Sequence, residues 1–117
     1  MTAWLIAFAF TQAVEVPIYL RATGGRLGVS FLASTLTHPV VWFVFPALLS
    51  GLERLVGADL GLPGYVGMVV CAELFAWLAE ALWLRRHGVA RALLISLLAN
   101  GSSLSLGLLS RALFDVP

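Results

Sequence analysis

The chain has 117 residues, of which 61% are hydrophobic and only 11% carry a charge. A water-soluble domain contains about a quarter charged residues, and a core of this chain length cannot enclose so large an apolar excess. The composition therefore excludes a soluble globular protein, and it excludes a disordered chain, which requires low hydrophobicity. Because the formal net charge is only +1 and the basic residues form no stripe, we expect no nucleic-acid partner. An integral membrane protein in contact with the lipid bilayer remains.

Long apolar runs, separated by charged or glycine-containing links, predict the fold. A helix needs about 20 apolar residues to cross a bilayer core of about 30 Å. The runs cover residues 2–20, 27–49, 65–84 and 90–110. Residues 51–64 contain scattered charges, glycine and proline, which predict a loop. We therefore expect an all-α, polytopic integral membrane protein in which residues 1–117 form a single transmembrane domain of four helices.

The distribution of basic residues predicts the orientation. All seven are arginines, and five of them flank the two short links: Arg21, Arg26, Arg85, Arg86 and Arg91. Basic residues accumulate on the cytoplasmic side of membrane proteins, where Tyr19 and Trp83 would belong to the interfacial aromatic belt. We therefore expect both links in the cytoplasm and both termini outside, in the inner membrane of a bacterial cell.

A shift of the sequence against itself suggests an internal repeat. An offset of 65 residues places Glu15 on Glu80, Arg21 on Arg86 and Arg26 on Arg91. An offset of 66 residues aligns 30–34 with 96–100. One interpretation is a duplication, with two parallel-repeated helical hairpins related by a pseudo-two-fold axis along the membrane normal. The other is coincidence, because arginines cluster at cytoplasmic helix ends in any case. A duplication predicts that the two glutamates lie at the same depth, near the axis.

Acidic residues within the apolar runs are the first candidates for a functional site. Glu15, Glu73 and Glu80 all lie inside predicted spans, where a charged side chain costs about 2.5–3.5 kcal/mol on insertion scales. They are interpreted either as protonated or hydrogen-bonded packing residues, or as a site that binds a proton or a cation. The sequence does not decide between these two interpretations.

The second span carries a polar cluster around a proline. Pro39 removes the backbone hydrogen bond to the carbonyl of Thr35, and a carbonyl freed in this way needs a partner inside a membrane. Threonine and histidine side chains of this cluster, such as Thr37 and His38, could supply that partner, which would make the cluster a structural kink. Alternatively, the loosened turn offers hydroxyls and an imidazole to a ligand, with His38 deep enough to contact the glutamate at position 73.

Two amides and a stripe of small residues complete the list of polar groups. Asn100 falls in the layer of the two repeated glutamates, and Gln12 lies one turn from Glu15. Ala99, Ser103 and Gly107 have the small-xxx-small spacing that lets helices approach closely. Tight packing explains the stripe, whereas Asn100 could be an auxiliary ligand. Auxiliary polar candidates are Gln12, Ser34, Thr35 and Thr37.

No nucleotide, haem or zinc-protease motif is present, and Cys71 is the single cysteine. We therefore expect no cofactor and no enzymatic activity, and the sequence does not define a metal site. The leading hypothesis is transport or conduction of a proton, cation or small solute through a polar intramembrane site, as an oligomer. A second is a non-catalytic accessory or assembly subunit that binds another membrane protein. A third is a small membrane-embedded, metal-dependent enzyme.

Overall fold

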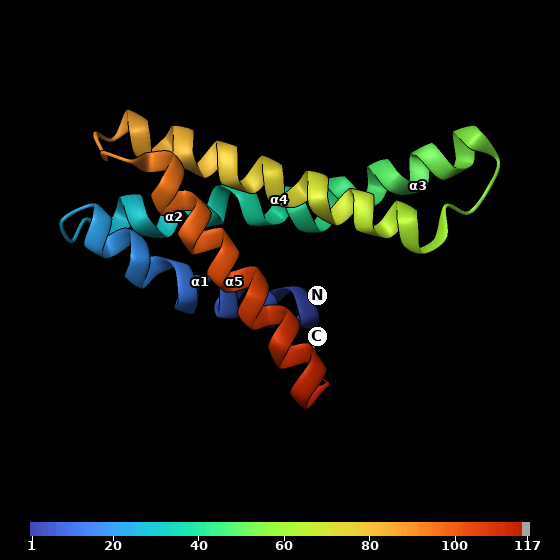
Figure 1. The fold of residues 1–117 in the computed structure, drawn as a ribbon, viewed down its shortest axis with the longest axis horizontal. Helices are drawn as coiled ribbons and strands as arrows, with labels where there is room; N and C mark the ends of the chain where they lie inside the picture. The colour runs from blue at the N-terminus through green and yellow to red at the C-terminus, as the bar shows by residue number, and fades with distance from the viewer. Residues whose placement is uncertain (116–117) are drawn as a thin grey trace.

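The computed structural model describes residues 1–115. They form the helices α1 (Thr2–Ala22), α2 (Leu27–Pro39), η1 (Val40–Val44), α3 (Phe45–Val56), α4 (Gly61–Arg86) and α5 (Ala92–Phe114). Because α2, η1 and α3 are continuous, these elements amount to four segments long and apolar enough to cross a membrane (Figure 1). The predicted all-α fold with four membrane-spanning helices is confirmed.

The second segment changes its helical geometry in the middle. Pro39, the last residue of α2, has no N–H to donate, and the chain widens into the π-helical turn η1 directly after it. We expected a neighbouring side chain to satisfy the carbonyl of Thr35. Instead, the hydroxyl of Thr35 itself donates to the carbonyl of Phe31 at 2.7 Å.

The predicted loop over residues 51–64 is too long. The second helix continues to Val56 and the next one begins at Gly61, so only residues 57–60 connect them. Gly57 ends α3 with a left-handed backbone (φ 76°), and the Glu53 carboxylate accepts the N–H of Leu60 at 3.1 Å. A helix over residues 27–56 is about 45 Å long and exceeds the hydrocarbon core, so charges at its end are tolerated there.

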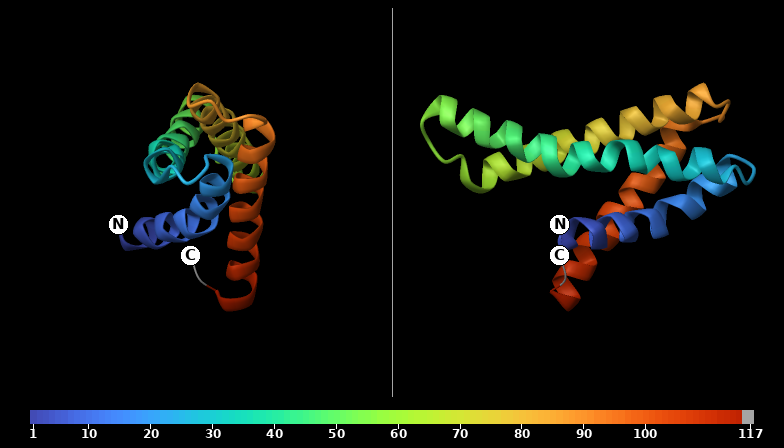
Figure 2. Two further views of the ribbon diagram at one scale, coloured as in Figure 1. Left: turned by 90° about the vertical axis from the view of Figure 1, so that its left-hand side faces the viewer. Right: turned by 180° about the vertical axis from the view of Figure 1, so that it is seen from behind.

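The helices form two hairpins, and each helix of one hairpin also packs against a helix of the other. α1 packs on α2 and α4 packs on α5, while α1 also packs on α5 and α2 on α4. Figures 1 and 2 show the turns 23–26 and 87–91 together at one end of the molecule. From that end, α1 and α5 diverge from the long pair made by α4 and the α2–η1–α3 segment.

Two side-chain contacts hold the shared end together. Arg26 donates from Nη2 to the carbonyl of His87 at 2.6 Å, and Trp83 donates from Nε1 to the carbonyl of Val29 at 3.0 Å. Each bond joins one hairpin to the other. The end that carries five of the seven arginines is therefore the closed end of the bundle.

The interior is unusually polar for a protein covered with leucine. Among residues 1–115, buried polar side chains are as numerous as buried apolar ones, and the apolar ones are mostly alanine. Small residues allow helix backbones to approach closely, as with Ala33 and Ala99, whose exposed fractions are 1% and 0%. Large apolar side chains instead lie on the outside, where they suit a lipid environment.

Candidate functional site

Glu15 lies at the centre of the bundle with two hydroxyl donors. Its side chain is only 1% exposed. Ser34 on α2 donates to one carboxylate oxygen, and Ser103 on α5 donates to the other at 2.5 Å. One donor therefore comes from the same hairpin as Glu15 and one from the other hairpin.

Glu80 has a corresponding shell of donors and is also 1% exposed. Thr37 on α2 donates to Oε1 at 2.5 Å, while Oε2 accepts from Nδ2 of Asn100 on α5 at 2.9 Å and from the hydroxyl of Tyr19 on α1. The donors again come from both hairpins, and every one of them is a neutral group.

The two shells match each other under the repeat seen in the sequence. Ser34, the donor to Glu15 from its own hairpin, aligns with Asn100, which serves Glu80 in the same way. Thr37 and Ser103, the donors that cross between hairpins, also align with each other. This exchange of partners supports the interpretation as an internal duplication.

The exchange also constrains the depth of the two carboxylates. Ser34 and Thr37 are three residues apart on α2, and Asn100 and Ser103 are three residues apart on α5, which is about 4.5 Å along a helix. Because each glutamate takes the deeper donor on one helix and the shallower donor on the other, their depths are close to equal. Both carboxylates therefore belong to one buried cluster.

The donors suit either protonation state of the cluster. A serine, threonine or tyrosine hydroxyl both donates and accepts hydrogen bonds, and its hydrogen rotates between partners. A protonated Glu15, for example, can donate to Ser34 or Ser103 after one of these hydroxyls turns. The shell therefore holds a carboxylate or a carboxylic acid without moving heavy atoms.

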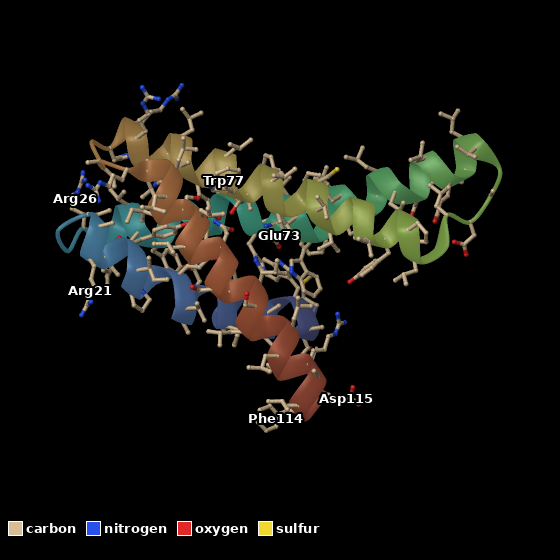
Figure 3. All side chains as sticks on the ribbon, in the orientation of Figure 1. Arg21, Arg26, Glu73, Trp77, Phe114 and Asp115 are labelled. Carbon is tan, nitrogen blue, oxygen red and sulfur yellow. The ribbon has the colours of Figure 1, made fainter. Side chains whose placement is uncertain are left out.

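A cavity of about 360 Å³ extends from this cluster between all four spans. Glu15, Glu80 and Asn100 lie at its deep end, and the exposed side chains of Tyr65 and Arg111 line its outer end. Glu73 lines the same cavity from α4 (Figure 3). The cavity thus connects the buried carboxylates with the surface on the side where the helices diverge.

His38 lines the cavity but has a different environment from the one we expected. It is 7% exposed and packs against the rings of Trp4, Phe8 and Trp42, with centroid distances of 6.1, 5.3 and 6.0 Å. Within residues 1–115, its Nε2 has no hydrogen-bond partner. The contact with Glu73 that the sequence allowed is therefore not formed through this atom.

Two of the auxiliary candidates serve the packing of one hairpin. Gln12 donates from Nε2 to the hydroxyl of Thr35 at 2.9 Å and to the carbonyl of Phe31 at 3.4 Å. Both contacts join α1 to α2, and neither residue lines the cavity. Ser34 and Thr37, in contrast, belong to the carboxylate cluster.

The structure adds two residues to the cluster. Tyr19 was expected at the membrane interface, but its side chain is fully buried and bonds Glu80. Ser103 was assigned to helix packing alone. Two spacings could have indicated both: Tyr19 follows Glu15 by four residues and Ser103 follows Asn100 by three, so each pair shares a helix face.

The indole N–H of Trp77 takes part in a contact between two helices. It donates from Nε1 to the carbonyl of Leu93 on α5 at 2.8 Å, and Ser96 donates to the carbonyl of Trp77 at the same distance (Figure 3). These two bonds join α4 to α5.

No three His, Cys, Asp or Glu side chains within residues 1–115 come together in a way that could hold a metal ion. Comparison of the chain with models of protein families, with curated proteins and with solved structures found no match.

Proposed function

We propose that this protein transports a proton, coupled to or in place of a small cationic solute, and that Glu15 and Glu80 are the groups that bind it. The observation that carries the proposal is the pair of buried carboxylates with only neutral donors at the deep end of a cavity. Two negative charges buried without a cation are costly. A proton or a bound cation is the countercharge that this arrangement lacks.

The exchange of donors between hairpins suggests how the site could change its access. Ser34 and Asn100 bond the glutamate of their own hairpin, whereas Thr37 and Ser103 bond the glutamate of the other one. A tilt of one hairpin against the other would break the second pair of bonds and keep the first. Loss or gain of a proton would favour one of the two arrangements, which is the coupling that transport requires.

The proposal extends to the assembly and its orientation. Four helices leave little room for a pathway of their own, so we expect an oligomer. We also expect the closed, arginine-rich end in the cytoplasm and both termini outside, in a bacterial inner membrane. The accessory-subunit hypothesis predicts no flux by the purified protein.

The test is proton flux into liposomes that contain the purified protein, measured with an internal pH-sensitive dye under an imposed membrane potential. Glu→Gln at positions 15 and 80 is nearly isosteric, keeps hydrogen bonding and abolishes titration. We expect both variants to fold and to reduce flux to the level of protein-free liposomes. Asp59→Asn, in the loop outside the cavity, is the matched control and should leave flux unchanged. Normal flux in folded E15Q and E80Q would refute the proposal, and absence of flux in the unmodified protein would favour the accessory subunit.

A further inference from the structure

The middle and outer parts of the cavity have chemistry that the carboxylate pair does not use. The lining contains three acidic side chains, Glu15, Glu73 and Glu80, and one arginine, Arg111, which is exposed at the outer end. Its walls are otherwise mostly apolar. A volume of about 360 Å³ lies within the range of pockets that hold small organic molecules.

Glu73 is the acidic group best placed to meet a ligand. It lies seven residues before Glu80 on α4, about 10 Å nearer the outer end. Unlike the two deeper carboxylates, it has no hydrogen-bond donor among residues 1–115. Acidic side chains inside membrane spans typically face the bundle interior or a water-filled cavity and mark the pathway of a substrate or an ion.

The walls around this level are suited to a cation that carries an apolar body. Phe10 and Trp42 line the cavity, and aromatic faces attract organic cations, most strongly when water is excluded. His38, also in the lining, has an unpartnered and buried Nε2 that can accept an N–H in the tautomer protonated on Nδ1. A bare metal ion would instead need several ligands close together, and no three His, Cys, Asp or Glu side chains within residues 1–115 come together in that way.

We propose that the cavity binds a small organic ammonium ion, with its nitrogen at Glu73 and its apolar body against Phe10 and Trp42. The deeper carboxylate pair is then left free to exchange a proton. This inference rests on the proposed function for the role of the ion as the transported solute. The binding site itself is tested by binding alone.

The experiment is calorimetric titration of the protein in lipid nanodiscs with phenethylammonium chloride. Empty nanodiscs supply the correction for partitioning into lipid. We expect saturable binding of one ion per chain, and a loss of affinity of about tenfold or more in Glu73→Gln. Asp59→Asn, the matched control outside the cavity, should bind like the unmodified protein.

An uncharged isostere separates recognition of charge from hydrophobic binding. n-Propylbenzene replaces the ammonium group of the probe by a methyl group, and we expect it not to displace the bound ion. This competition uses the unmodified protein, so it decides the question even if Glu73→Gln fails to fold. Absence of saturable binding, displacement by n-propylbenzene, or unchanged affinity in a folded Glu73→Gln variant would each overturn the inference.

The outcome is distinguishable from that of the flux experiment. Binding of phenethylammonium without proton flux would refute the proposed function but would still support an ammonium site in the cavity. Proton flux without binding of phenethylammonium would support the proposed function of the carboxylate pair and would overturn the inference of an ammonium site.

Discussion

The hydroxyl donors around Glu15 and Glu80 differ from other hydroxyl groups in this protein because each bonds a buried carboxylate oxygen. Removing one of them leaves a buried carboxylate oxygen short of one hydrogen-bond donor from the protein. Such a loss typically costs about 1–3 kcal/mol, whereas a hydroxyl that faces lipid contributes nothing of this kind.

Ser103→Ala should therefore lower the free energy of unfolding by about 1–3 kcal/mol, because Glu15 loses its donor from α5. Thr37→Val should cost a similar amount, since Thr37 holds the equivalent place at Glu80. The measurement is unfolding in mild detergent, followed by the loss of helical circular dichroism. Ser105→Ala, an exposed site on the same helix as Ser103, is the control and should be neutral. Equal stability of the Ser103 and Ser105 variants would show that the bond to Glu15 contributes nothing.

The sequence predicted part of this cluster for a physical reason. An acidic residue inside an apolar run is costly and conspicuous, so Glu15 and Glu80 stand out without a structure. Asn100 stands out because it falls in the same layer as these two glutamates. Ser103 and Tyr19 do not, because serine is common in packed membrane helices and tyrosine is common at interfaces. Gln12 was polar enough to be a candidate, yet its amide is used for contact between α1 and α2.

At the scale of the elements, the sequence predicts the membrane-spanning helices correctly but not where each of them ends. The four spans follow from apolar length alone, and the structure contains all of them. The loop between the second and third spans is shorter than the sequence predicts, because charges and glycines do not end a helix there. Outside the hydrocarbon core a helix tolerates both, and α3 continues through Gly51, Glu53 and Arg54. The π-helical turn after Pro39 was not predicted, because the sequence indicated a kink there without its geometry.

A pair of glycine substitutions tests this helix end. Gly51 lies within α3 with nothing within 4 Å of an added Cβ, so Gly51→Ala should stabilise the protein by about 0.5–1 kcal/mol. Gly57 has φ of +76°, which an alanine adopts only with strain, so Gly57→Ala should destabilise it by about 1 kcal/mol. The measurement is again thermal unfolding in detergent, with the two variants compared side by side. If residues 51–56 were a loop, the alanine at position 51 would give no stabilisation.

At the scale of the whole molecule, two matched hairpins meet at the arginine-rich end, and from there α1 and α5 diverge from the long pair made by α4 and the α2–η1–α3 segment. The repeat in the sequence indicated the pairing of Glu15 with Glu80, and the exchanged donors agree with it. The divergence of α1 and α5 from the other pair could not be predicted, because it depends on which helix faces approach, and so the cavity was not predicted either. That divergence gives the carboxylates their route to the surface.

Cysteine labelling tests the orientation of this arrangement. Ala90 lies in the link between α4 and α5, and Ala58 lies in the loop at the opposite end; both are exposed. After replacement of Cys71, a membrane-impermeant maleimide applied to intact cells should label Ala58→Cys but not Ala90→Cys. Permeabilised cells are the control, in which both sites should react. Labelling of position 90 in intact cells would place the arginine-rich end outside and reverse the proposed orientation.

The central claim is that Glu15 and Glu80 exchange protons within the folded protein, and infrared spectroscopy tests it most directly. In pH-difference spectra of the protein in lipid bilayers, a carboxylic acid and a carboxylate absorb in separate bands. We predict pH-dependent bands that disappear in E15Q and in E80Q but persist in D59N. Spectra in which neither glutamine substitution removes a pH-dependent band, with the protein folded throughout, would contradict the claim and leave the two glutamates as packing residues.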